Sequence, residues 1–458
     1  MRWPVSLPDD PAAAVERALP AHVAAAAARL AAAGFRTVCV GGAVRDALLG
    51  IASANPWDLA TAAPPERVLE LWPDAVPTGL AHGTVTLPHP GGAVEITTFR
   101  TEGAYSDARR PDRVFYTESL AADLRRRDFT VNALAYDPAG RELVDGCGGL
   151  ADLARGCLRA VGDPAARLTE DALRALRAAR LVATHGFALE PATAAALPAV
   201  APLLPRLSAE RVRDELAKLL LGEAPDAGLE VLREAGLLGG VLPELAACVG
   251  VPQNRYHAHD VYRHTLATLR AAPPRPRVRW AALGHDLGKP ATRAERAAGE
   301  ATFYGHAPLG GEITAALLDR LRFPRAERDA VVRLVREHLF DYREEWTDAA
   351  VRRFLARVGP ENLADLFALR RADIVGTGVG EDDSGIARLE ARIGAVLARG
   401  EALTVAALAV DGADVMRTLG VGPGPRVGEV LRALLEEVLE DPERNTRERL
   451  LERVRALA

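Results

Sequence analysis

Histidines and carboxylates cluster in the second half of this 458-residue chain. Six of the ten histidines lie between residues 257 and 338, and one of them forms the pair His285-Asp286 within the run LGHDLGK. Neutral imidazoles and carboxylates are ligands of divalent metals that activate water, and here they are spread over successive predicted helices. The pattern predicts a metal site, whereas a single His-Asp pair without such neighbours would usually be structural.

A glycine turn near the N-terminus is the second candidate site. A short β-rich run over residues 37–40 passes through Gly41-Gly42 into a predicted helix over residues 43–49. Glycines let the backbone approach a ligand closely, and the free N–H groups of a first helical turn favour anions. We therefore expect a triphosphate here, although a plain strand-to-helix turn would use the same two glycines.

Two acids on predicted strands could hold a metal ion together. Asp58 lies on one β-prone run, and Glu95 lies on another that follows a proline- and glycine-rich turn, as in a hairpin. Alternation places Glu95 on the face opposite Val94 and Ile96. A carboxylate inside an apolar strand is costly unless it is paired or bound to metal, so both acids are candidates for one metal site. A surface glutamate on an edge strand is the alternative.

An acid and an arginine three residues apart predict a site for a planar ligand. Asp171 and Arg174 would share one face of a helix predicted within LTEDALRALRAARL. The carboxylate would accept from an exocyclic amino group and the guanidinium would donate to the adjacent ring nitrogen. Cytosine and adenine present that order, whereas uracil and guanine present the reverse. A surface ion pair is the alternative.

Further basic residues could bind phosphate and ribose. The run of three arginines over residues 125–127 precedes Asp128 and an apolar segment that contains Asn132. We expect Asp128 and Asn132 to face a sugar or a metal, with a solvated charge run as the alternative. Arg177 and Arg180 would point toward phosphates or toward solvent.

The elements that position these residues fit a multidomain protein. With 458 residues, 49% of them hydrophobic, the chain can bury more than one core. The net charge of −5 means that any RNA contact would depend on local basic patches. No apolar stretch suits a signal peptide or a membrane span, and the four scattered cysteines predict a reduced cytoplasmic protein. An alanine-rich helix over residues 12–33 is expected before the first strand.

These motifs occur in the order found in one family. GGAVRD, WDLAT, GTVTL, EITTFRTEGAYSDARRPDRV, RRRDFTVNALAYD and LTEDALRALRAARL resemble motifs of the class II tRNA nucleotidyltransferase and poly(A) polymerase family. The resemblance implies an α+β fold, with an N-terminal polymerase-beta-like nucleotidyltransferase head built on a small mixed sheet. The expected domains are an N-terminal helix over residues 1–36, the head over 37–160, a helical neck with the nucleotide-selecting motif over 161–250, an HD domain over 251–400 and a helical tail over 401–458.

The resemblance also implies an activity: addition of all or part of the 3′-terminal CCA to tRNA from CTP and ATP, without a nucleic-acid template. The expected partners are therefore the tRNA 3′ end, CTP and ATP, with no membrane, and the sequence leaves the oligomeric state open. Asp58 and Glu95 would hold Mg2+, and Asp128 would be the third catalytic acid. The residues expected to bind the nucleotide are Gly41, Gly42, Arg45, Arg110, Asn132, Asp171, Arg174, Arg177 and Arg180.

One departure from the family pattern concerns the metal site of the head. The family usually places two aspartates one residue apart on a strand, but Pro56 stands where the first would be. Either Asp58 and Glu95 suffice together with a water, or the head only binds tRNA and the chain is a hydrolase. Poly(A) addition to general RNA is a further alternative, as is addition of CC alone or of A alone.

The second half resembles an HD-domain phosphohydrolase. This resemblance implies a divalent metal of unspecified identity, with His306 and His338 available for a second ion or for the phosphate. Hydrolysis of cyclic phosphates or nucleotides would then take place on the same chain. The implied metal ligands are His264, His285, Asp286 and Asp373.

Overall fold

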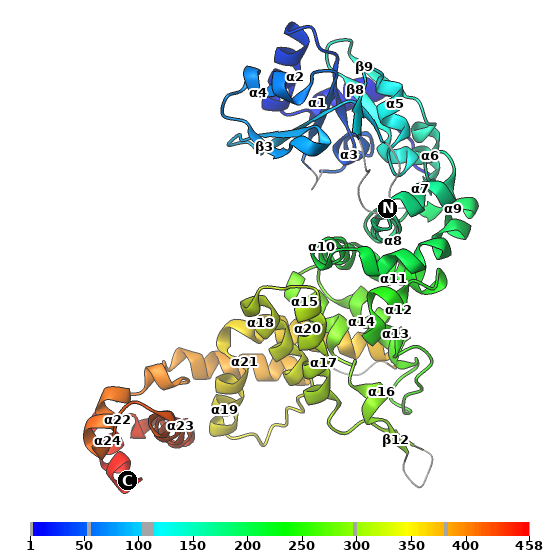
Figure 1. Cartoon of the computed structure of the whole chain (residues 1–458). Helices are drawn as coiled ribbons and strands as arrows, with labels where there is room; N and C mark the ends of the chain where they lie inside the picture. Colours follow the sequence, from blue (N-terminus) through cyan, green and yellow to red (C-terminus); the bar gives the residue numbers. More distant parts are fainter. Residues whose placement is uncertain (1–2, 53–55, 103–113, 296–299, 380–382, 458) are drawn as a thin grey trace. The chain divides into compact units, whose positions relative to one another are not determined.

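The computed structural model describes residues 3–52, 56–102, 114–295, 300–379 and 383–457. The chain divides into two compact units, Met1–Ala246 and Ala247–Ala458, of which the first contains the main sheet and the second is mostly helical (Figure 1). The predicted α+β class is confirmed in this part of the chain. None of the helices described is both long enough and apolar enough to cross a lipid bilayer.

A mixed sheet forms the centre of the first unit. Among the described residues it has seven strands, in the order β3 (Val76–Gly79), β4 (Thr84–Leu87), β5 (Val94–Thr98), β2 (Asp58–Thr61), β1 (Thr37–Val40), β8 (Leu134–Asp137) and β9 (Glu142–Asp145). The pair β2 and β5 is parallel and the other neighbouring pairs are antiparallel. The predicted hairpin of β4 and β5 is confirmed. Because β5 lies between β4 and β2, the alternative that Glu95 lies on an edge strand is wrong.

Burial along the strands follows their place in the sheet. All four residues of β1, Thr37–Val40, are buried, as expected of a strand covered on both faces. In β5 the residues alternate, with Val94 and Ile96 buried and Glu95 exposed. The alternation predicted for β5 is therefore confirmed, and it turns Glu95 to the face opposite the core.

Helices surround the sheet and continue beyond it in the first unit. They are α1 (Pro11–Ala18), α2 (Ala21–Ala32), α3 (Gly42–Leu48), α4 (Pro65–Leu71), α5 (Leu120–Arg125), α6 (Gly149–Arg155), α7 (Pro164–Glu170), α8 (Leu173–His185), α9 (Pro191–Ala196), α10 (Ala209–Leu220), α11 (Pro225–Glu234), α12 (Leu238–Val241) and α13 (Pro243–Ala246). Two small two-stranded sheets accompany them: β6 (Arg100–Glu102) with β7 (Val114–Tyr116), which is antiparallel, and β10 (Cys157–Leu158) with β11 (Ala188–Leu189), which is parallel.

The single helix predicted over residues 12–33 is wrong, because the structure has two helices there. Leu19 ends α1 in an extended conformation, with φ −71° and ψ 120°, and Pro20 follows it. The proline ring clashes with a helical conformation of the residue before it, so the helix stops at this point. Gly34, at φ 89°, follows α2, as predicted.

A second predicted helix is also interrupted. Asp171 is extended, with φ −135° and ψ 106°, and separates α7 from α8. Its side chain accepts the N–H of Leu173 at 3.1 Å, as a residue at a helix start does. Asp171 and Arg174 therefore do not share one helix face, and the predicted geometry of that pair is wrong.

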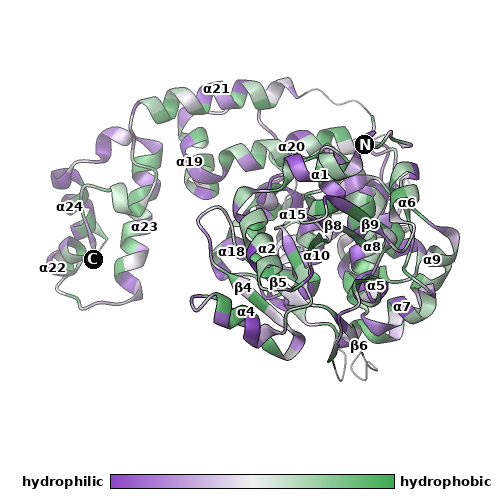
Figure 2. Cartoon of the chain, turned by 90° about the horizontal axis from the view of Figure 1, so that it is seen from above, coloured by the Kyte–Doolittle hydropathy of each residue, from purple (hydrophilic) through white to green (hydrophobic). Residues whose placement is uncertain are grey.

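The second unit is a helical array. Its elements are α14 (Val261–Ala271), α15 (Pro276–Gly284), α16 (Lys289–Thr292), β12 (Ala294–Glu295), β13 (Ala301–Thr302), α17 (His306–Arg320), α18 (Arg325–Glu337), α19 (Asp348–Val358), α20 (Leu363–Thr377), α21 (Ser384–Ala398), α22 (Gly412–Leu419), α23 (Pro425–Glu440) and α24 (Arg447–Ala456). Figure 2 shows hydrophobic and hydrophilic residues alternating along α21, as expected of a helix buried on one face.

Close packing of α11 against α8 yields a stability prediction. A Cβ added at Gly228 would lie 2.7 Å from the carbonyl oxygen of Ala179 in α8. We expect Gly228→Ala to lower the free energy of unfolding by about 1–3 kcal/mol, because backbone cannot yield as a flexible side chain does. Urea denaturation measures the change. Gly239→Ala is the matched control, since its Cβ would meet nothing within 4 Å. Equal stability of Gly228→Ala and the wild type would contradict this packing.

Candidate active sites of the two units

The first unit contains a charged cavity of about 740 Å³. Its described lining includes no Phe, Tyr or Trp, and most of its side chains carry charge. The predicted site residues that line it are Gly41, Gly42, Arg45, Asp58, Glu95, Asp128, Asn132, Asp171, Arg174, Arg177 and Arg180. Arg110 lies outside the described residues. One cavity therefore collects the predicted residues that the structure describes in this unit.

The carboxylates of Asp58 and Glu95 lie side by side in this cavity. The two residues are direct partners in the parallel register of β2 and β5. Burial, together with the neighbouring Glu95, raises the pKa of Asp58 to about 7, although Arg127 opposes the shift. Oδ1 of Asp58 is buried and accepts no hydrogen bond from the described residues. Paired acids with an unsatisfied buried oxygen have the chemistry of a divalent-cation site.

Pro56 is exposed, precedes β2 and is not among the residues that line the cavity. Gly41 closes the cavity beside them: its φ is +85°, and a Cβ there would lie 3.7 Å from Oδ2 of Asp58. A non-glycine residue at this φ would be strained. The glycine turn and the acids are thus neighbours, as a site for a metal and a phosphate would require.

Asp128 is held by several partners. Its Oδ2 accepts from Nη1 of Arg177 at 2.7 Å, and its Oδ1 accepts from Nδ2 of Asn132 at 3.1 Å. Burial opposes ionisation of Asp128, but the Arg177 guanidinium outweighs it and keeps the pKa of Asp128 well below the usual range. The alternative of a solvated charge run is wrong for Asp128, which is only 7% exposed.

The arginines of α8 are also held by hydrogen bonds to neighbouring acceptors. Glu215 of α10 accepts from Nε of Arg180 at 2.6 Å and from Nε of Arg177 at 3.4 Å. Arg174 is 7% exposed and donates from Nη1 to the Arg167 carbonyl at 2.6 Å. The alternative of a surface ion pair between Asp171 and Arg174 is therefore wrong. Asp171 instead accepts from Nη2 of Arg211 at 2.7 Å.

The contribution of α10 to the cavity was not predicted from the sequence. Arg211, Glu215 and Lys218 of this helix all line the cavity. Their spacing of four and three residues puts them on one helical face. That spacing was the available signal, but charges on a helix are more often solvated, and only the tertiary structure shows this face turned to the cavity.

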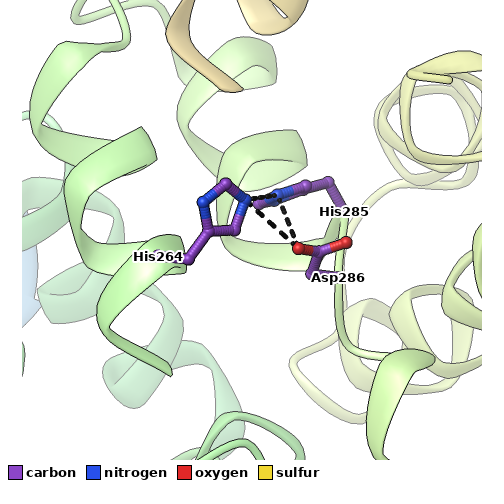
Figure 3. Close-up of side chains that lie close together, drawn as sticks. All are labelled: His264, His285 and Asp286. Atoms are coloured by element: carbon purple, nitrogen blue, oxygen red, sulfur yellow. Dashed lines mark hydrogen bonds and ion pairs between the residues drawn. The ribbon is translucent and has the colours of Figure 1, made fainter. Parts of the chain in front are cut away.

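The second unit brings the four predicted metal ligands together. Nε2 of His264 lies 3.0 Å from Nε2 of His285, 3.2 Å from Oδ2 of Asp286 and 3.1 Å from Oδ1 of Asp373. Figure 3 shows the imidazoles of His264 and His285 converging on the Asp286 carboxylate. The four residues come from α14, the segment after α15, and α20. The two acids outweigh the effect of burial and raise the pKa of His264 to about 9.

His306 and His338 lie beside this group. Oxygen or nitrogen atoms of Asp286, His306 and His338 fall within 4.8 Å of one another, as do those of His264, His285 and Asp286. Burial lowers the pKa of His306, and it lowers that of His338 to about 3, so both rings are neutral near pH 7. Asp286 is thus common to two candidate ligand groups.

Backbone carbonyls fix the tautomer of three of these histidines. The Nδ1 atoms of His285, His306 and His338 lie 2.7–2.8 Å from carbonyl oxygens three residues earlier in the chain. A carbonyl oxygen can only accept, so Nδ1 of each ring must donate to it, and a metal would be bound through Nε2. Nε2 of His306 is buried without a hydrogen-bond partner in the described part of the chain. The donor set therefore fits a divalent cation.

Asp286 and Asp373 line a second cavity, of about 670 Å³. Two of its positively charged side chains, Lys289 and Arg370, were not predicted as site residues. Nζ of Lys289 lies 2.7 Å from Oδ2 of Asp286, and Nη1 of Arg370 donates to Oδ2 of Asp373 at 2.6 Å. Lys289 ends the run LGHDLGK, so its place three residues after Asp286 was the available signal. These cations give the cavity an anion-binding component next to the candidate metal ligands.

Comparison with known proteins gives consistent matches along the chain. The model of the Poly A polymerase head domain matches residues 37–159, that described as "Probable RNA and SrmB- binding site of polymerase A" matches residues 186–249, and the HD domain matches residues 261–415. The chain is 35% identical to the CCA-adding enzyme of Geobacillus stearothermophilus over 421 residues, which cover 91% of this chain and 92% of that enzyme.

Two further matches extend the comparison. The chain is 40% identical to the A-adding tRNA nucleotidyltransferase of Deinococcus radiodurans over 413 residues, covering 87% of this chain and 90% of the relative. The crystal structure of the CCA-adding enzyme of Bacillus stearothermophilus in complex with CTP is similar to this structure, with a TM-score of 0.69 and 30% identity over 95% of this chain and 96% of that chain.

The raised pKa of Asp58 predicts a pH-dependent stability. Between about pH 4 and pH 7 the folded chain retains a proton that the unfolded chain has lost, so this residue lowers stability as pH rises. Without metal, we expect Asp58→Asn to exceed the wild type in free energy of unfolding by on the order of 1–2 kcal/mol at about pH 8, and to match it at about pH 4. Urea denaturation in EDTA measures this, with Asp74→Asn as an exposed control. A difference independent of pH would refute the assignment.

Proposed function

Because the chain belongs to the family of CCA-adding enzymes, which are tRNA nucleotidyltransferases, we propose that it adds all or part of the 3′-terminal CCA to tRNA from CTP and ATP. One observation carries the proposal: a single cavity contains paired acids for a metal, arginines for a triphosphate, and an acid with an arginine for a base. A site that had lost the reaction and only bound tRNA would not need the paired acids.

The metal is proposed to be Mg2+ held by Asp58 and Glu95, where it would activate the attacking 3′-hydroxyl and bind the triphosphate. The residues of the chain supply the rest. Asp58 must ionise to bind the cation, and its pKa of about 7 places that ionisation near neutral pH. The two acids stand in for the usual three, since Pro56 contributes no ligand, and Asp128 is already bound by Arg177.

Base selection is proposed for Asp171 and Arg174, although they lie on two elements rather than one helix. Arg211 uses one oxygen of Asp171, and a carboxylate has further lone pairs to accept from the amino group of cytosine or adenine. Arg174 is fixed by the Arg167 carbonyl, by Glu170 and by the Arg126 carbonyl, so the N–H groups that these acceptors leave over have a defined direction. A fixed acceptor and a fixed donor would favour C and A over U and G.

Which nucleotides are added is a matter for experiment, since the relatives include both CCA-adding and A-adding enzymes. The A-adding relative is a tRNA nucleotidyltransferase by name, which favours tRNA over general RNA and argues against poly(A) addition. A role in tRNA processing also favours the cytoplasm as the location.

Nucleotide addition is tested with tRNAs that end before CCA, after C and after CC, each incubated with Mg2+, labelled CTP and labelled ATP. We expect addition of C, C and A, or of one part of that sequence, and a loss of at least about 100-fold in Asp58→Ala because the metal ligand is removed. Sequencing the products identifies the nucleotides. His285→Ala is the control and should keep the activity. tRNA binding without any addition would overturn the proposal.

A second candidate function is supported by the ligand cluster of the second unit. We propose that His264, His285, Asp286 and Asp373 hold a divalent metal that supplies activated water for hydrolysis of phosphate esters. Lys289 and Arg370 would bind the phosphate oxygens beside it. The identity of the metal and the ester are left to the assay, and this activity is independent of the head.

The metal content and hydrolysis of this site are measured together. We expect His285→Ala to lose bound metal, seen by inductively coupled plasma mass spectrometry, and to lower hydrolysis of cyclic nucleotide phosphates by about 100-fold or more. His259→Ala is the matched control, because His259 is exposed and lies outside the cavity. Hydrolysis that persists without metal would contradict this assignment.

A further inference from the structure

His185, the last residue of α8, connects this helix to α3, and both helices contribute to the proposed nucleotide site. Its Nε2 is 3.1 Å from Oδ1 of Asp46 in α3, and its side chain is only 9% exposed. Its ring stacks on Phe187 with a centroid distance of 5.4 Å and an interplanar angle of 9°. The indole N–H of Trp3 donates to its carbonyl oxygen at 3.1 Å. Ring and backbone are thus both held in place.

His185 donates the hydrogen bond to Asp46. Burial lowers the pKa of His185, so the ring is neutral near pH 7 and carries one N–H. A carboxylate oxygen can only accept, so Nε2 must carry the proton. Nδ1 lies 2.7 Å from the hydroxyl oxygen of Thr184, which also donates to the Arg180 carbonyl oxygen at 2.9 Å. The Asp46 carboxylate therefore fixes the Nε2–H tautomer of His185.

Asp46 in turn accepts hydrogen bonds from Arg45 and so orients its guanidinium. The same oxygen that His185 contacts, Oδ1 of Asp46, accepts from Nε of Arg45 at 2.9 Å and from Nη2 at 2.6 Å. On its other side Nη1 of Arg45 donates to Oδ1 of Asn132 at 2.6 Å. The guanidinium is 2% exposed and lines the cavity, so its orientation depends on these acceptors.

We propose that His185 is a positioning residue for nucleotide binding, which holds Asp46 so that Arg45 presents its guanidinium to the triphosphate. The inference rests on the proposed function, because it takes Arg45 as a triphosphate ligand. It adds a physical link between α8, which carries Arg174, and α3, which carries Arg45. The contact of His185 with Asp46 thus joins the proposed base-selecting helix α8, at its C-terminal end, to the proposed phosphate-binding helix α3.

The test measures ATP binding to the full-length protein in Mg2+ by isothermal titration calorimetry. We expect His185→Leu, which keeps the packing on Phe187 but has no donor, to raise the dissociation constant for ATP about tenfold. His185→Gln retains a donor at the position of Nε2 and should restore affinity to within about twofold, whereas His185→Asn should not. His22→Leu is the matched histidine control on the outer helix α2.

A double-mutant cycle separates positioning from a general loss of structure. If His185 acts through Arg45, adding His185→Leu to Arg45→Ala should change ATP affinity by less than about twofold. The affinity for tRNA ending in CC should stay within about twofold throughout. An equal loss of ATP affinity in both backgrounds would overturn the inference, as would unchanged affinity in His185→Leu. Should His185→Leu fail to fold, the contrast between the Gln and Asn variants decides.

Failure of this inference is distinct from failure of the proposed function. A wild-type protein that binds ATP but adds no nucleotide to tRNA would overturn the proposed function alone. The comparison of ATP affinities would still decide the role of His185, because it does not depend on turnover.

Discussion

A charge buried inside a protein must be matched by partners, because an unpaired ion costs several kcal/mol. This constraint organises the first unit. Its cavity walls contain a connected series of ions and amides in which each member fixes the next. The series links the helix after the glycine turn, the segment after α5, and the two helices α8 and α10. Its members are Asp46, Arg45, Asn132, Asp128, Arg177, Glu215 and Arg180.

Such pairing makes the site ready before a ligand arrives. Asp128 and Glu215 neutralise part of the positive charge of the arginines. This reduces the electrostatic repulsion between guanidiniums that lie close together. The acids Asp58 and Glu95 are the opposite case. Two carboxylates side by side, one of them with a buried and unsatisfied oxygen, are destabilising until a cation binds. The arginines of the cavity are thus already in place to bind an anion, whereas its two acids repel each other until a cation binds.

In the second unit the buried imidazoles and carboxylates are again held by partners. Three imidazoles are fixed by backbone carbonyls, which direct Nε2 inward, and buried carboxylates accept the charge of His264 and Lys289. Here local structure sets the orientation of each ring, since each carbonyl is three residues from its histidine. The convergence of α14, α15 and α20 then brings the ligands from distant parts of the sequence to one point.

The sequence by itself determined the strand-turn-helix at Gly41, the hairpin around Glu95, the α+β class and the order of the motifs, because alternation, glycine turns and local spacing are short-range properties. It failed where a local choice depended on context. Asp171 is extended and separates α7 from α8, and its side chain accepts the N–H of Leu173. The break at Leu19 is different, because the local signal for it, Pro20, was present in the sequence. The register that sets Asp58 beside Glu95, the turn of α10 toward the cavity, and the contact of His185 with Asp46 were decided only by the tertiary structure. Each joins residues far apart in the chain, and which charge is buried against which depends on packing that no local pattern records.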